Sequence, residues 1–325
     1  MAFFTIQRNG FTTVSQLIHT AIQDMTDHGF SVVFPVGYNP ATPLPAPFKV
    51  ILAAGPDVDP LSTTQGWRVC FQVTADQTCA AFVGTSFQIQ DDGTLSTLSG
   101  SGGATLGWAG QVGKLSSSIS SDPEVGFINR ATRVSSNSNG TFPMSSRLSI
   151  SSRGFFLGAF EGSWANGIFD PNAGASYFNW LLVQRPVDKS TGAILTTGKA
   201  PLFCVNKVDN LYWRFVVRES DVPHPTPAVN AAAHTPDNFR LINIENQVSV
   251  AEEKTYLISF MNSLNTPRFR YTQELDMLGI VSADVVMEGV AVPLSVYGGS
   301  KTYTALPGSS SYNSGVRVMV ITADS

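Results

Sequence analysis

The clearest candidates for chemistry in this sequence are four histidines and one short acidic motif. Imidazole nitrogens are typical ligands of zinc, and the imidazole ring is the commonest general base. None of the histidines lies at the i, i+4 spacing of a local metal motif, so they predict no shared metal or catalytic site: His19, His28, His224 and His234. We expect His19 on the polar flank of a helix and His28 in its last turn, while the other two lie in a proline-rich stretch.

The acidic motif is Asp57-Val-Asp59, whose carboxylate spacing is found in sites for divalent cations. Proline and glycine surround it in Gly55-Pro-Asp-Val-Asp-Pro60, which is equally the composition of a surface turn. Both interpretations stay open from the sequence.

Motifs for covalent or cofactor chemistry are missing from the sequence. It has no Gly-x-Ser-x-Gly elbow, no phosphate-binding loop and no dinucleotide fingerprint. Cys70, Cys79 and Cys204 are odd in number and form no Cys-x-x-Cys pair, which argues against a disulfide framework and a thiolate metal site. We therefore expect a protein that is not an enzyme and needs no cofactor.

Charge is scarce in this chain. Charged residues make up 14 % of 325 residues, whereas roughly 25 % is usual in soluble domains. A subunit whose surface is covered by neighbours fits this deficit, because interface cores are depleted in charge. A surface built from Ser, Thr, Asn and Gln, as in many secreted β-proteins, fits it too. The net charge of −4 argues against a nucleic-acid partner held by electrostatics.

One segment has the periodicity of an amphipathic helix. Six apolar residues repeat at the 3-4 spacing of one helix face: Val14, Leu17, Ile18, Ala21, Ile22 and Met25. Thr13 with Gln16 has the pattern of a capping box, and Gly29 stands where a left-handed residue would end the helix. The opposite face is polar and is expected in water: Gln16, Thr20, Gln23, Asp24 and Asp27.

The remaining apolar runs are short, rich in β-branched and aromatic residues, and separated by turn residues. The run 67–73 alternates, which places Trp67, Val69, Phe71 and Val73 on one side of a strand. The sequence therefore predicts a mainly β (α+β) fold of β-sandwich or barrel-like domains with one N-terminal amphipathic helix. No window reaches the roughly 18 apolar residues of a membrane span, so we expect no membrane insertion.

Composition divides the chain into five parts. A helix with a β domain occupies 1–90, a Ser/Gly-rich excursion or arm 91–145, a central β domain 146–222, a Pro-rich connector 223–238 and a C-terminal β region 239–325. A shorter Pro-rich stretch, 40–47, is expected to be a linker or an arm that lies on a neighbour.

Two segments carry a resemblance to a known class of proteins. The first runs from Phe11-Thr-Thr-Val through Gly29-Phe-Ser-Val-Val, and the second comprises Phe178-Asn-Trp-Leu-Leu-Val-Gln-Arg and Tyr212-Trp-Arg-Phe-Val-Val-Arg-Glu. Together they resemble structural proteins of contractile-tailed bacteriophages. The resemblance implies a tail, baseplate or neck component of the virion, made in the host bacterial cytoplasm. It also implies partners among other virion structural proteins and a homo-oligomer with cyclic symmetry.

Tryptophans in Gly-rich polar surroundings suggest a second class of function. Trp108 and Trp164 would stack on sugar rings or anchor a protein interface if exposed, and would be satellite core residues if buried. The interface residues we predict come from the helix, these tryptophans and one strand: Val14, Leu17, Ile18, Trp108, Trp164, Arg214 and Arg218. A module that binds a receptor or host glycan is the first alternative to a structural subunit, and a glycan-degrading enzyme is the second.

Overall fold

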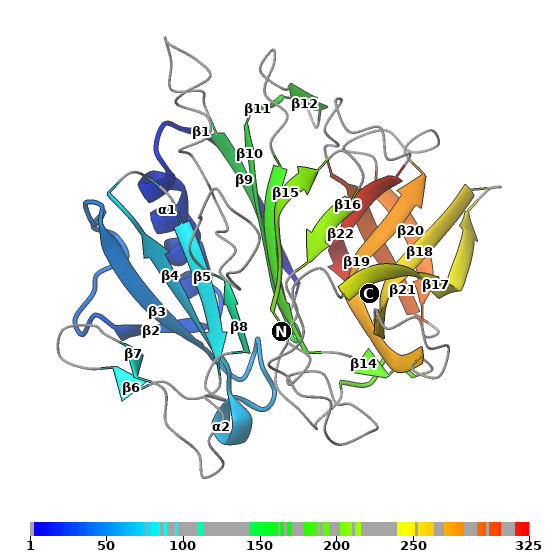
Figure 1. Cartoon of the computed structure of the whole chain (residues 1–325), viewed down its shortest axis with the longest axis horizontal. Helices are drawn as coiled ribbons and strands as arrows, with labels where there is room; N and C mark the ends of the chain where they lie inside the picture. The colour runs from blue at the N-terminus through cyan, green and yellow to red at the C-terminus, as the bar shows by residue number, and fades with distance from the viewer. Residues whose placement is uncertain are drawn as a thin grey trace.

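The structure, a computed structural model, consists mainly of antiparallel strands (Figure 1). It describes residues 3–75, 77, 79–84, 88–89, 95–96, 109–112, 144–161, 163–165, 168–170, 178–185, 187–188, 191–194, 202–209, 212–215, 239–250, 253–262, 270–282, 291–296, 299–306 and 316–324. In this part of the chain, α1 (Val14–Asp27) is the one helix longer than a single turn, and α2 is Ser62–Gln65. The predicted mainly β fold with an N-terminal helix is thereby confirmed.

Helix α1 begins and ends near the predicted residues. The Thr13 hydroxyl accepts a hydrogen bond from the backbone N–H of Gln16 (3.2 Å). The Gln16 side chain does not return to Thr13, because it accepts from the N–H and hydroxyl of Thr12 (3.0 and 2.9 Å). Only half of the predicted capping box therefore forms. His28 caps the other end, and Gly29 has the left-handed φ of 98° that was expected of it.

The apolar face of α1 is buried as predicted. Its six apolar residues are at most 3 % exposed. The Val, Leu, Ile and Met side chains among them each contribute about 1.5–3 kcal/mol when fully removed from water. The helix contacts β2, β4 and β9, so its buried face stabilises two different sheets at once.

The first of these is the outer sheet, five strands in the order β2-β3-β4-β5-β8. Its strands are β2 (Phe30–Phe34), β3 (Phe48–Ala54), β4 (Arg68–Val73), β5 (Cys79–Gly84) and β8 (Ala109–Val112). The alternation predicted for 67–73 is confirmed, since Trp67, Val69, Phe71 and Val73 all belong to the core beneath the sheet. Strand β8 comes from the predicted Ser/Gly-rich excursion.

The second is the central sheet, six strands in the order β1-β9-β10-β13-β15-β16. Its strands are β1 (Phe4–Phe11), β9 (Met144–Ser151), β10 (Gly154–Glu161), β13 (Phe178–Gln184), β15 (Leu202–Asp209) and β16 (Tyr212–Phe215). Every residue of β9 is buried, so both faces of this strand are covered. One face packs with α1 and the outer sheet in a single core, which contains Leu148, Phe155 and Leu157.

The C-terminal sheet approaches the other face of the central sheet. Its order is β17-β18-β19-β22-β21-β20, and β14 also pairs with β19. Its strands are β14 (Val187–Asp188), β17 (Phe239–Val250), β18 (Glu253–Asn262), β19 (Arg270–Ser282), β20 (Ala291–Val296), β21 (Gly299–Ala305) and β22 (Val316–Asp324). Met277 of β19 joins the two sheets, because its N–H donates to Gln184 Oε1 (3.2 Å) and its sulfur accepts from the Ser151 hydroxyl (3.3 Å).

Two short hairpin pairs complete the described strands. They are β6 (Gln88–Ile89) with β7 (Leu95–Ser96), and β11 (Ser163–Ala165) with β12 (Ile168–Asp170). The three main sheets follow one another across the molecule, with the central sheet in the middle (Figure 1). Most of the predicted excursion 91–145 and all of the connector 223–238 lie outside the described residues.

The Pro-rich stretch 40–47 packs on this chain. Leu44 and Ala46, together with the preceding Tyr38, are partly buried against the core that α1 and the two sheets share. The stretch connects β2 to β3 across this core, so at least these side chains are held by the chain itself.

Candidate functional site

Two charged side chains meet in the interior. The guanidinium of Arg185, which follows β13, donates to the Asp59 carboxylate through Nε to Oδ1 (2.6 Å) and through Nη2 to Oδ2 (3.1 Å). The two side chains are 1 % and 0 % exposed. Two backbone groups also donate to this carboxylate, the N–H of Leu61 (3.0 Å) and the N–H of Trp67 (3.4 Å). The pair therefore joins the loop after β3 to the central sheet.

This geometry bears on the Asp57-Val-Asp59 motif. Asp57 is exposed, whereas Asp59 turns inward and its two oxygens already accept four hydrogen bonds. The N–H groups of Val58 and Asp59 both donate to the carbonyl of Gly55 (3.0 and 2.9 Å), which closes a turn. The turn interpretation of the motif holds, and a divalent cation would have to compete with a guanidinium for Asp59.

His19 is buried, and its expected place on the polar flank of the helix is wrong. It is 5 % exposed because the segment that follows β2 covers it. Its Nδ1 lies 2.7 Å from the hydroxyl of Tyr38, and a hydrogen bond also links the ring to the backbone of Pro40. Desolvation by burial lowers the pKa of His19 and, in the same way, raises the pKa of Tyr38 to about 12. The site is a hydrogen-bonded support for the Pro-rich stretch.

The C-terminal part of α1 carries a second polar cluster. Asp24, expected in water, is 5 % exposed because Arg8 of β1 covers it through Nη2 to Oδ1 (2.6 Å) and Nε to Oδ2 (3.2 Å). This contact raises the pKa of Arg8. His28 stands at the helix end as predicted, where its Nδ1 lies 2.8 Å from the Asp24 carbonyl oxygen and its ring stacks on Phe4 (3.4 Å between centroids).

The described cysteines are poor nucleophiles. In the described part of the structure neither Cys70 nor Cys79 forms a disulfide, and both are buried. Burial raises the pKa of Cys70 to about 12, although the charge of Lys49 acts in the opposite direction. A thiol with such a pKa carries almost no thiolate near neutral pH.

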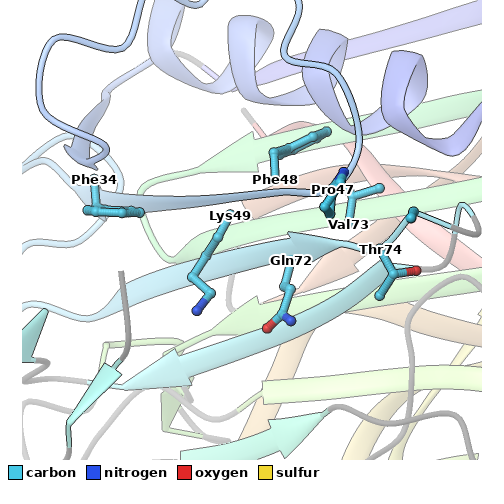
Figure 2. Close-up of a pocket in the computed structure, with 8 residues that line it drawn as sticks. Phe34, Pro47, Phe48, Lys49, Gln72, Val73 and Thr74 are labelled. Atoms are coloured by element: carbon cyan, nitrogen blue, oxygen red, sulfur yellow. The ribbon is translucent and has the colours of Figure 1, made fainter. Parts of the chain in front are cut away.

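A groove of about 400 Å³ opens on the outer sheet (Figure 2). It lies where the end of β2 meets the start of β3 and the end of β4, and its lining includes Phe34, Pro47, Lys49, Gln72, Val73 and Thr74. Figure 2 shows Phe34, Lys49 and Gln72 on the side of the sheet turned away from the helix, with Phe48 on the helix side.

Strand register explains why these three side chains meet. Phe34 pairs with Ile51, and Lys49 pairs with Gln72. Because side chains alternate along a strand, Lys49 and Ile51 share one face, and so do their cross-strand partners. Directly paired side chains on a face lie about 5 Å apart, and diagonal neighbours about 7–8 Å apart. The register thus places an aromatic ring, an ammonium group and an amide around one groove.

The predicted interface residues fall into two groups. Val14, Leu17 and Ile18 are 0 % exposed and are covered by residues of this same chain, so they offer no surface to a second subunit in this conformation. Trp164 lies in β11 and Arg214 in β16, but their side chains are outside the described part of the structure. Trp108 and Arg218, with His224 and His234, lie outside the described residues altogether.

The groove residues and Arg185 were missed by sequence reasoning. The alternation in β3 and β4 was a signal for the groove, because Lys49 and Gln72 interrupt apolar strands on the face opposite the core. No local signal marked Arg185, whose partner lies 126 residues away.

Within the described ranges, no three His, Cys, Asp or Glu side chains come together in a way that could hold a metal ion. No helix among these residues is both long and apolar enough to cross a membrane. Comparison of the chain with protein-family models, with curated proteins and with solved structures gives no match.

Proposed function

We propose that this chain is a non-enzymatic structural subunit of a tailed-phage virion, in a tail, baseplate or neck position, and acts through subunit–subunit contacts. We also propose that its packed sheets form a β-sandwich-like arrangement. The resemblance of two sequence segments to structural proteins of contractile-tailed phages supports a place in a phage virion. The scarcity of charged residues supports a role that depends on contacts between subunits.

The observation that carries the proposal is that the chain has few charged residues and buries several of them. Only 14 % of residues are charged, and several of these lie inside the chain: Asp24, Asp59, Arg147, Arg185 and Lys301. Among the described residues, these five charges are therefore withdrawn from the surface. Free soluble proteins keep their surfaces charged, whereas surfaces that neighbours cover are depleted in charge.

Strand β1 supports the same role. It lies at an edge of the central sheet, where β9 is its one partner among the described strands, and Thr5, Gln7 and Gly10 are exposed. The free side of an edge strand offers N–H and C=O groups to a strand of a neighbouring chain. A register shift between Arg8 and Phe11 breaks the regular pairing, so the part of β1 suited to such pairing is residues 4–8.

Cryo-electron microscopy of the purified full chain tests the proposal. We expect particles whose class averages show rings of identical subunits with cyclic symmetry. Particles of single-chain size at every protein concentration would contradict it. In such rings we also expect Arg214, Arg218, Trp108 or Trp164 at the contacts between subunits.

A further inference from the structure

Strand β1 has one edge with which no described strand pairs. Residues 4–8 form ladder hydrogen bonds with β9 on one side, and their remaining hydrogen bonds in the described part of the chain are side-chain contacts with Ser149 and Asp24. The other side of this segment therefore offers backbone N–H and C=O groups to an added strand. These are strong hydrogen-bonding groups, and they are spaced as a β ladder requires.

The two faces of β1 differ in character at this edge. Phe4 and Ile6 pack against the core between the central sheet and α1, but they are only partly buried. Thr5 and Gln7 alternate with them on the opposite face and are exposed. The edge is thus apolar along one face and polar along the other, so a strand that pairs here should have the same arrangement.

The charge of β1 suits a second copy of the same strand. Arg8 is the one charged residue of β1, and the carboxylate of Asp24 balances it through two hydrogen bonds (2.6 and 3.2 Å). Like charges destabilise a pair of strands when they stand directly opposite each other. Two copies of β1 can therefore approach without such repulsion in any register that keeps their Arg8 residues apart.

The limits of the regular segment determine that register. Strand β1 begins at Phe4 and its regular pairing ends at Arg8, so Ile6 is the midpoint. An antiparallel pair centred on Ile6 uses the whole segment of both copies and sets Thr5 opposite Gln7 of the second copy. It also separates the two Arg8 residues by four positions, about 13 Å along the strands. Ile6 then meets its own counterpart on the core side, where both lose apolar surface to water.

We propose that β1 pairs with β1 of a second copy across a two-fold axis at Ile6, so that two central sheets join into one. Thr5 and Gln7 meet twice across this axis, and a hydroxyl and an amide can each donate and accept a hydrogen bond. A two-fold axis is the smallest cyclic symmetry, and its contact is self-complementary. The inference rests on the proposed function, since it names one contact through which copies of the chain assemble.

Disulfide cross-linking of the full chain tests the register. A mixture of Thr5→Cys and Gln7→Cys chains, oxidised mildly, should give a linked dimer that contains one chain of each kind, because these positions are directly opposite. Each variant alone should cross-link poorly, since like positions are diagonal neighbours about 7–8 Å apart, beyond the reach of a disulfide. Wild-type chains give the background of the three native cysteines. Gln23→Cys replaces Thr5→Cys in the control mixture, because Gln23 is exposed on α1 away from this edge, and should give no linked dimer.

Two charge variants test the same pairing without a covalent bond. Thr5→Glu with Gln7→Glu sets like charges opposite each other twice and should raise the dissociation constant of the dimer by roughly tenfold or more. Thr5→Lys with Gln7→Glu changes the same positions but sets opposite charges together, so it should associate as the wild type does. Gln7→Glu suits the fold of both variants, since residue 7 pairs with Arg147 of its own chain. Light scattering over a series of protein concentrations measures the association.

The outcomes separate this pairing from the wider proposal. A chain that oligomerises without the cross-link between positions 5 and 7, or whose two charge variants associate equally, would overturn the pairing of β1 and leave the proposed function intact. A chain that stays monomeric at every concentration would overturn both. If a charge variant unfolds, as judged by circular dichroism, the cross-linking result still decides.

Discussion

Arg185 and Asp59 form a two-point ion pair between layers of the molecule, with bonds of 2.6 and 3.1 Å, although 126 residues separate them in the chain. The backbone of Arg185 is held as well, because its N–H donates to the carbonyl of Arg153 (2.7 Å). Arg185 therefore links the loop after β3, through its side chain, to the end of β13 and, through its backbone, to the residue before β10.

Removing one partner of this pair should be costly. Arg185→Met leaves the Asp59 carboxylate buried without a counter-charge, so we expect the free energy of unfolding to fall by about 3–5 kcal/mol. Adding Asp59→Asn removes that charge while an acceptor oxygen remains for the N–H groups of Leu61 and Trp67. The double variant should accordingly be more stable than Arg185→Met alone. Urea unfolding followed by fluorescence measures both differences.

The Arg8–Asp24 pair is the matched control for this test. Arg8 has a 44 % exposed side chain, so its loss in Arg8→Ala should lower the free energy of unfolding by about 1 kcal/mol or less. Equal losses for Arg8→Ala and Arg185→Met would show that the buried pair has no special role.

Helix α1 should tolerate charge on one face only. Leu17 is 0 % exposed, so Leu17→Asp places an unpaired carboxylate in the shared core, and we expect a loss of more than about 4 kcal/mol or no folded protein. Gln23→Asp makes the same charge change at an exposed position of the same helix and should change stability by about 0.5 kcal/mol or less. Thermal unfolding monitored by circular dichroism compares the two, and a folded Leu17→Asp variant with an unchanged melting temperature would contradict the packing described for α1.

The pKa of His19 predicts a pH dependence. Because burial lowers this pKa below its usual 6.5, the unfolded chain binds a proton at a higher pH than the folded chain does. The contribution of His19 to stability is therefore complete above the unfolded pKa and is lost as pH falls from there toward the folded pKa. We expect His19→Gln to lose less stability than the wild type between about pH 7 and pH 5.

Both His19→Gln and the wild type contain the same carboxylates, so the titration of those groups affects the stability of both proteins equally. The difference between their two pH profiles therefore reports His19. Tyr38→Phe is a useful companion, since it keeps the covering ring and removes the hydroxyl that contacts His19. An identical loss of stability with falling pH in wild type and His19→Gln would exclude His19 as a source of the dependence.

The buried thiols should resist alkylation. With a pKa of about 12, Cys70 stays protonated in the folded chain at about pH 8, and no reagent reaches it directly. We expect iodoacetamide to leave Cys70 and Cys79 unmodified in the native protein and to modify both in urea, as peptide mass spectrometry would report. Rapid labelling of Cys70 under native conditions would mean that the outer sheet opens.

Local elements could be predicted from the sequence because their signals are local. The six apolar residues of α1 and the alternation in β4 follow from periodicity alone. Gly29 at the end of α1 follows from the conformation that a helix end requires.

Contacts between distant segments could not be predicted in this way. His19 looked polar and exposed on its helix, and it is buried because a Pro-rich segment packs over it. Strand β9, Met-Ser-Ser-Arg-Leu-Ser-Ile-Ser, contains four serines that suggest a water-facing side, yet sheets cover both of its faces. The groove likewise depends on the pairing of Lys49 with Gln72, which a single strand does not reveal.

Light scattering coupled to size-exclusion chromatography tests the central claim, that this chain acts through contacts with copies of itself. As protein concentration rises, we predict that the mass increases from that of one 34.8 kDa chain to a defined whole-number multiple and then stays constant. A mass of one chain at the highest concentration that the protein tolerates would contradict the claim.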